Sequence, residues 1–211
     1  APIDEIKSRG NELYTHVPAP AAPTLRSILA ATDRLDRVVR MMLRGTTHDP
    51  ASRPPRKETF GVAGFLWGLA HDWDAALRQR ALRVELEIAP DLPDVKTDPA
   101  LVQEILTELI DNAAKFTPRG GTIQLTALHA RQDLVIDVHD SGAGIHPQDA
   151  PVATERFFRG QSSESIPGAG LGLGVAAALA ERLGGSLEVL PGPGGRVRLL
   201  LPVQAQELAA A

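Results

Sequence analysis

The chain has 211 residues, no cysteine and a formal net charge of −4. The lack of cysteine excludes a disulfide framework, a thiolate metal site and a cysteine nucleophile, and the mild acidity offers no basic surface for nucleic acid. Uncharged stretches such as 60–70 fall well short of the roughly 18 residues that a membrane-spanning helix needs, so we expect no membrane contact from this chain itself. Because the chain starts with alanine, we expect it to be part of a longer protein.

The first 46 residues have the pattern of a helical hairpin. Prolines between Val17 and Pro23 end a short first helix, and Thr24 is suited to cap a second one. The second helix, over 24–45, carries a seam spaced by three and four residues: Leu25, Ile28, Thr32, Leu35, Val39 and Met42. Such a seam predicts packing in a helical bundle, although an amphipathic helix packed on its own domain would show the same pattern.

A polar linker over 47–56 precedes a region that mixes helical and strand periodicities. The expected elements are, in chain order, a helix over 60–80, a strand over 83–88, a helix over 99–116, paired strands over 122–127 and 134–138, a helix over 170–183, and closing strands over 186–190 and 196–201. Asp98 and Pro99 should start the second of these helices. Strands joined by short turns predict an α+β fold, with helices on one face of a mixed, mostly antiparallel sheet.

Polar side chains form a stripe on the helix predicted at 99–116. Glu108, Asn112 and Lys115 follow one another at intervals of about one turn, so they share a face. An amide oxygen can hold a hard cation, an amine can meet a phosphate, and a carboxylate can orient water or accept a proton. A solvated helix face would show the same spacing.

Two glycine-rich segments flank a polar stretch. Asp140-Ser-Gly-Ala-Gly-Ile145 follows a strand, where glycines allow close backbone approach and the aspartate can accept a hydrogen bond from an exocyclic amine. Gly168-Ala-Gly-Leu-Gly-Leu-Gly174 leads into a helix whose N-terminal N–H groups favour anions. The stretch between them, 146–167, is predicted to form a mobile lid over a nucleotide. Taken singly, the first segment could be a plain turn and the stretch a surface loop.

In this order, the four segments resemble those of one family. Residues 57–205 resemble the catalytic ATP-binding domain of sensor histidine kinases, within the superfamily of gyrase and heat-shock-chaperone ATPases. The segments that carry the resemblance are 108–116 (N box), 140–145 (G1 box), 155–159 (F box) and 168–174 (G2 box). The helix over 24–45 resembles the second helix of the dimerisation and phosphotransfer domain. The expected organisation is a partial hairpin over 1–46, the linker, the catalytic domain and a tail over 206–211.

The resemblance implies transfer of the γ-phosphoryl group of ATP to a histidine and then to an aspartate of a response-regulator receiver domain. It implies ATP and Mg²⁺ as cofactors, with Asn112 as the metal ligand and catalytic residue and Glu108 as the general base. Asp140 would receive the adenine amino group. The residues implied in nucleotide binding are Asn112, Lys115, Phe116, Asp140, Gly142, Gly144, Ile145, Arg159, Gly168, Gly170, Leu171, Gly172, Leu173 and Gly174.

The sequence departs from the family pattern in three places. Thr154 stands where the F box usually has a phenylalanine, and Arg196 stands where a threonine near the adenine is common. No phosphoacceptor motif is present among the six histidines, and only Asn11, in a degenerate box, could mark its place. We therefore expect the fragment alone to lack an acceptor.

The same resemblance implies a homodimer through the helical hairpin, weakened by the shortened first helix. It also implies a cytoplasmic location, either free or as the cytoplasmic part of a membrane-anchored sensor. Two alternatives remain open. The chain could be a non-catalytic nucleotide-binding module with a regulatory or scaffolding role, or an anti-sigma-factor-type serine kinase on the same fold, which the seam over 24–45 disfavours.

Overall fold

The computed structural model describes residues 54–160, 166 and 170–203. The residues from Pro55 onwards belong to one compact unit. The predicted helical hairpin, Gly168 and the tail over 206–211 lie outside the described residues. The described part therefore covers most of the predicted catalytic domain and of its four motif segments, whereas residues 161–165 and 167 of the predicted lid lie outside it.

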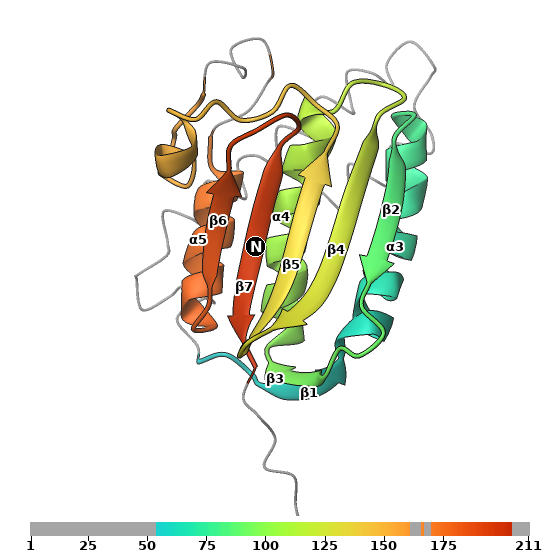
Figure 1. The fold of residues 1–211 in the computed structure, drawn as a ribbon, viewed down its shortest axis with the longest axis vertical. Coiled ribbons are helices and arrows are strands. Elements are labelled where there is room, and N and C mark those ends of the chain that lie inside the picture. The colour runs from blue at the N-terminus through green and yellow to red at the C-terminus, as the bar shows by residue number, and fades with distance from the viewer. Residues whose placement is uncertain (1–53, 161–165, 167–169, 204–211) are drawn as a thin grey trace, which may run out of the picture. The chain divides into compact units, whose positions relative to one another are not determined.

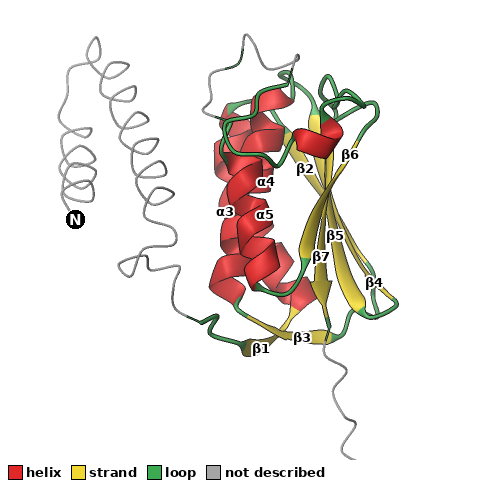
Figure 2. Cartoon of the chain, turned by 90° about the vertical axis from the view of Figure 1, so that its left-hand side faces the viewer, coloured by secondary structure: helices red, strands yellow, loops and turns green. Residues whose placement is uncertain are grey.

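A five-stranded sheet with helices on one face forms this unit (Figures 1 and 2). The elements are β1 (Glu58–Gly61), α3 (Val62–Gln79), β2 (Arg83–Ile88), β3 (Asp94–Thr97), α4 (Pro99–Phe116), β4 (Thr122–Ala130), β5 (Asp133–Asp140), the 3₁₀ turn η2 (Ala150–Val152), α5 (Gly172–Arg182), β6 (Ser186–Leu190) and β7 (Arg196–Pro202). The sheet order is β2-β4-β5-β7-β6, with β2 parallel to β4 and the other neighbours antiparallel. The predicted α+β class is confirmed.

Side chains from one face of the sheet and from α3, α4 and α5 form the core. On β5 and β7, alternate residues such as Leu134, Ile136 and Leu199 are almost fully buried. Helix α4 contributes Ile105, Leu106, Leu109 and Ile110 from its opposing face. Burial alternates along β4 and β7, while β5, the central strand, is buried on both faces over 134–138. The helices bury one face each with the 3.6-residue period and cover a single face of the sheet.

The N-terminal edge differs from the sequence-based expectation. Phe60 was expected to start a helix but lies in β1, opposite Val95 of β3, and α3 begins at Val62. Strands β1 and β3 form a separate two-stranded sheet of four residues each. Four residues show barely two periods of alternation, so the sequence pattern does not reveal such strands.

Asp98 joins two parts of the chain. Its side chain caps α4 by accepting the backbone N–H groups of Ala100 at 3.0 Å and Leu101 at 3.2 Å. The same buried carboxylate accepts the N–H of Arg56 at 2.7 Å, just before β1. The predicted start of α4 is confirmed, and its cap also holds the segment that enters the domain.

We expect Asp98→Ala to lower the free energy of unfolding by about 2–3 kcal/mol, because both the helix cap and the bond to Arg56 are lost. Urea unfolding followed by circular dichroism measures the change. Asp98→Asn separates the two contributions: its amide oxygen can still cap the helix, but its NH2 group cannot accept the N–H of Arg56, so we expect a smaller loss than in Asp98→Ala. Equal stability of the alanine variant and the parent would show that the cap does not hold α4.

Candidate functional site

The polar stripe of α4 lies beside its buried face. Ala113 and Ala114 are buried, Glu108 and Asn112 are partly exposed, and Lys115 is exposed in the last turn. Buried and exposed positions alternate along α4 because its apolar residues recur with the 3.6-residue period of a helix. The polar residues between them lie at the edge of the buried face. Asn112 and Glu108 are therefore held on a rigid element, at the edge of its buried face.

Asp140 ends β5 and is buried, with 5% of its surface exposed. Its Oδ1 accepts the backbone N–H of Gly142 at 2.8 Å, and its own N–H donates to the carbonyl of Gly195 at 2.8 Å. Burial raises the pKa of the Asp140 carboxyl above its ordinary value, although the backbone N–H groups of Gly142 and Gly195 and the nearby His139 act in the opposite direction. The carboxylate is thus fixed in orientation before any ligand arrives.

The loop after β5 packs closely against two other segments. A Cβ on Gly142 would overlap the carbonyl of Phe116, at the end of α4. Gly144 has a φ of +83°, and a Cβ there would overlap the carbonyl of Gly192, in the β6–β7 turn. Only glycine allows both approaches. The G1 segment therefore joins the end of α4 to the β6–β7 turn.

Gly192, Gly194 and Gly195 belong to this site, although the sequence pattern predicted only a turn for them. Gly192 donates its N–H to the carbonyl of Ile145 at 3.4 Å. A Cβ on Gly194 would overlap the carbonyl of Asp140, and one on Gly195 would overlap its Oδ2. The density of glycine in 191–195 is the signal that could have revealed this close packing.

The F and G2 segments also meet. The N–H of Phe157 donates to the carbonyl of Gly170 at 2.9 Å. Both residues have positive φ, +67° and +66°, which is uncommon for a bulky residue such as phenylalanine. Phe157 is 62% exposed. In the same stretch, Arg159 donates from Nη2 to the carbonyl of Ile166 at 2.8 Å, so this bond lies within the loop, and a phosphate contact by Arg159 stays a prediction.

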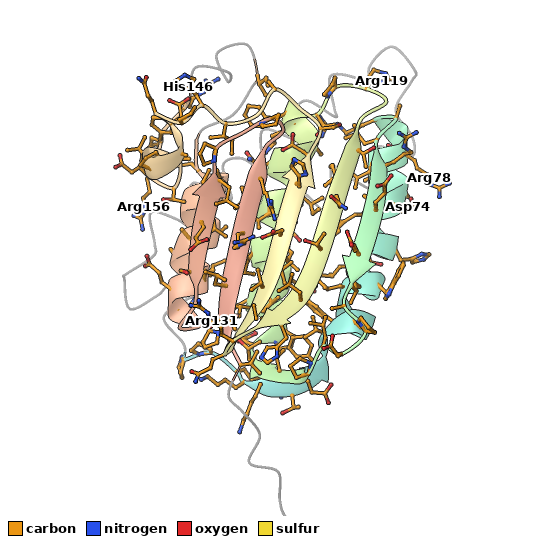
Figure 3. The ribbon with its side chains drawn as sticks, viewed as in Figure 1. Asp74, Arg78, Arg119, Arg131, His146 and Arg156 are labelled. Carbon is orange, nitrogen blue, oxygen red and sulfur yellow. The ribbon has the colours of Figure 1, made fainter. Side chains whose placement is uncertain are left out.

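The N and G2 segments meet through the packing of α4 on α5. A Cβ on Gly172, the first residue of α5, would lie 2.9 Å from Oε2 of Glu108. Leu171 is buried, while Leu173 is partly exposed. The structure thus brings the four predicted segments together in one chain of contacts. Figure 3 shows His146, which follows the G1 segment, at the end of the sheet opposite Arg131 of the β4–β5 turn.

Arg196 lies away from this site. Its guanidinium contacts Asp137 on the sheet face opposite the helices, and Nε of Arg198 donates to the same carboxylate at 2.8 Å. The position next to Asp140 belongs instead to Gly195. The expectation that Arg196 replaces the adenine-side threonine is therefore wrong, because alternate residues of a strand point to opposite faces.

The pair of arginines sets the charge of Asp137. Burial alone would raise the pKa of the Asp137 carboxyl, but the hydrogen bonds and charges of Arg198 and Arg196 outweigh it and lower the pKa below its ordinary value. The carboxylate therefore stabilises the fold at pH above its unfolded-state pKa, and this stabilisation is lost as the pH falls through the lowered value.

We expect Asp137→Asn to be less stable than the parent at pH 7, by about 1–3 kcal/mol after allowing for the partial exposure of both arginines. The difference should shrink in acid, as the parent carboxyl becomes protonated. Urea unfolding at a series of pH values measures it. A difference that is the same at every pH would show that the ion pairs do not stabilise the fold.

The described residues offer limited metal ligands of their own. Among residues 54–160, 166 and 170–203, no group of three or more His, Asp or Glu side chains could hold a metal ion. Mg²⁺ commonly binds through one or two protein oxygens together with substrate phosphates. The partly exposed amide of Asn112, with Glu108 one turn away, fits such a nucleotide-borne ion and does not fit a metal held by protein alone.

The comparisons with known proteins agree with this geometry. A family model described as "Histidine kinase-, DNA gyrase B-, and HSP90-like ATPase" matches residues 97–205. The chain belongs to this family. The signal transduction histidine-protein kinase/phosphatase MprB of Mycolicibacterium vanbaalenii is 36% identical over 137 residues, which cover 60% of the chain and 28% of that relative. The chain thus spans less than a third of the relative's length.

Solved structures show the same fold. A mycobacterial sensor histidine kinase MprB structure is 27% identical with a TM-score of 0.59, and the match covers 70% of the chain and 98% of that structure. Histidine kinase ThkA in complex with the response regulator protein TrrA is 17% identical with a TM-score of 0.71, over 98% of the chain and 59% of that chain. The predicted resemblance to the ATP-binding module of two-component sensor kinases is confirmed. No helix in the described part of the chain combines the length and apolarity that crossing a membrane requires.

Proposed function

We propose that the chain is the ATP-binding catalytic portion of a two-component sensor histidine kinase. The observation that carries this proposal is the buried Asp140 carboxylate, held by the glycine backbone of the G1 segment and of the β6–β7 turn. A buried carboxylate of fixed orientation favours ligands that bring a hydrogen-bond donor. A ligand without an amine would leave the carboxylate buried and unpaired, which would cost binding free energy. The exocyclic amine of adenine is such a donor.

At the base end of the site, Asp140 accepts the adenine amino group while Gly142 holds its other oxygen. Gly142 and Gly144 let the loop that carries Asp140 pack against the backbone of Phe116 and Gly192. Phe116 and Ile145 supply apolar contact to the base. These residues orient the nucleotide so that its phosphates point toward α5.

At the phosphate end, the N-terminus of α5 and the amine of Lys115 receive the negative charge. Mg²⁺, when bound with the nucleotide, neutralises charge on the phosphates. The amide oxygen of Asn112 would hold this ion, and Glu108 is placed to accept the proton of the attacking histidine or to orient it. Most of the rate enhancement then comes from positioning and charge neutralisation.

We infer the binding partners of this chain from its relatives, and not from contacts within the chain itself. The complex of ThkA with a response regulator supports a receiver domain as the final phosphoryl acceptor. The seam over 24–45 supports a homodimer through the hairpin. We place the module in the cytoplasm, where ATP and receiver domains are available to it. The acceptor histidine has to come from outside the recognisable motifs of this chain.

Phosphoryl transfer in trans tests the activity. The chain is mixed with γ-³²P-ATP, Mg²⁺ and a histidine-bearing dimerisation hairpin taken from MprB, and the catalytic domain of MprB serves as the matched positive control. We expect acid-labile label on the hairpin histidine. Acid-stable label on a serine of an added partner would instead favour the anti-sigma-type kinase.

A third outcome separates binding from catalysis. If the chain binds nucleotide but transfers no label while the MprB control does, the non-catalytic regulatory or scaffolding module is the better description. The observation that favours this non-catalytic function is the missing phosphoacceptor motif.

A further inference from the structure

Glu108 reaches across from α4 to the beginning of α5. Its Oε2 lies 2.9 Å from the position that a Cβ on Gly172 would take, and Gly172 is the first residue of α5. Glu108 itself is only partly exposed. The carboxylate therefore rests against the first turn of α5, in space that any other residue at position 172 would occupy.

The first turn of α5 favours an anion and has no acidic residue of its own. The N-cap residue, Leu171, makes no side-chain capping hydrogen bond, and no acidic side chain lies in the first turn. The N–H groups of a first helical turn lack partners within the helix, and the helix dipole adds partial positive charge there. A carboxylate from a neighbouring helix is thus stabilised at the same end of α5 to which the proposed function brings the nucleotide's phosphates.

We propose that Gly172 is a positioning residue: without a side chain, it lets the Glu108 carboxylate rest on the first turn of α5 in the nucleotide-free chain, and phosphates displace that carboxylate when they bind. This inference rests on the proposed nucleotide binding. Two anionic groups cannot share one helix end without repulsion. Displacement frees Glu108 to act as a base only once phosphates are in place, which couples substrate binding to the assembly of the catalytic groups.

Two variants weaken the resting contact in different ways. Glu108→Gln keeps the shape of the side chain but removes its charge. Gly172→Ala keeps the charge but moves the carboxylate, and it should fold because alanine favours helices and the clashing atom is the end of a flexible side chain. Gly68→Ala is the matched control: it also replaces a glycine in a helix, α3, but nothing lies within 4 Å of its new Cβ.

Nucleotide affinity gives the first readout. By calorimetric titration with Mg²⁺ and a nonhydrolysable ATP analogue, Glu108→Gln and Gly172→Ala should each bind about three- to tenfold more tightly than the parent, the scale of one charge at a helix end. Adenosine, which has no phosphate, should bind all variants equally in a competition assay. Gly68→Ala should match the parent for both ligands.

The resting contact has a readout that needs no nucleotide. In a pH titration of the nucleotide-free parent, the backbone amide signal of Gly172 should shift as Glu108 is protonated, and this shift should vanish in Glu108→Gln. A Gly172 amide that does not respond to Glu108 would overturn the inference while leaving nucleotide binding untouched.

Other results would also overturn it. Tighter binding by Glu108→Gln but not by Gly172→Ala would indicate long-range repulsion without a resting contact. Unchanged or weaker binding by both would show that Glu108 does not compete with phosphate. If the parent binds no nucleotide, the proposed function fails, and the displacement step fails with it.

Discussion

Asp140→Asn should bind Mg²⁺ and a nonhydrolysable ATP analogue about 10- to 150-fold more weakly than the parent. The change keeps the size of the side chain but removes the negative charge that accepts the adenine amine, and hydrogen bonds to charged groups contribute about 1.5–3 kcal/mol. Calorimetric titration measures the loss. Asp133→Asn, at the opposite end of the same strand, is the matched control and should bind like the parent.

An Asp140→Asn variant that folds like the parent and binds with equal affinity would place the base elsewhere. Folding is checked by thermal unfolding. Asp140 is buried, its carboxyl is held by the backbone N–H groups of Gly142 and Gly195, and burial raises its pKa. The asparagine should therefore not destabilise the fold as the loss of a salt bridge would.

The raised pKa of Asp140 also predicts a pH dependence of binding. Affinity in the parent should fall as the pH is lowered through this pKa, at a higher pH than for an ordinary aspartate, because a protonated carboxyl no longer offers a charged acceptor. The same group stabilises the folded state as the pH falls, since the folded state holds the proton more tightly. Weaker binding therefore cannot be ascribed to unfolding at this group. The affinity of the Asp140→Asn variant should not change over the same pH range. If the affinity of both proteins declined alike, the pH dependence would belong to another group.

The second large effect is expected at Asn112. Asn112→Ala should lower phosphoryl transfer in trans by about 10²–10³-fold, since one preorganised group that places charge at the phosphates contributes on this scale. It should also weaken the Mg²⁺ dependence of nucleotide binding, while adenosine binds as in the parent. Gln103→Ala, at an exposed position of the same helix, is the matched control.

Retained transfer in Asn112→Ala would remove the metal role from this residue. If transfer is lost but adenosine binding is lost as well, the substitution has disturbed the site as a whole, and the assignment to the metal would be wrong. Only a variant that loses phosphoryl transfer but binds adenosine like the parent supports the metal role of Asn112.

Local signals predicted several elements well. The aspartate-proline pair at 98–99 marks the start of α4 because both residues act within one helical turn, and α4 ends at Phe116 as expected. Strand β2 covers the predicted 83–88 because its alternation extends over six residues. The four motif segments, which were singled out from the sequence, lie in contact with one another, since each touches at least one of the others. Their role in nucleotide binding stays a prediction.

The pairing of the strands determines on which face of the sheet a residue lies, and the sequence pattern did not predict this everywhere. Arg196 and Gly195 are neighbours, yet only Gly195 lies at Asp140, while Arg196 pairs with Asp137 on the opposite sheet face. A shift of one residue moves a side chain to the other face of a sheet, and the register of β7 on β5 follows from packing. The parallel pairing of β2 with β4 depends in the same way on the long connection through α4.

Calorimetric titration of the unmodified chain with a nonhydrolysable ATP analogue, with and without Mg²⁺, tests nucleotide binding most directly. We predict saturable binding of one nucleotide per chain that tightens when Mg²⁺ is present. Absence of binding in both conditions, by a chain that unfolds cooperatively, would contradict the assignment of Asp140, Asn112 and the α5 N-terminus to a nucleotide site.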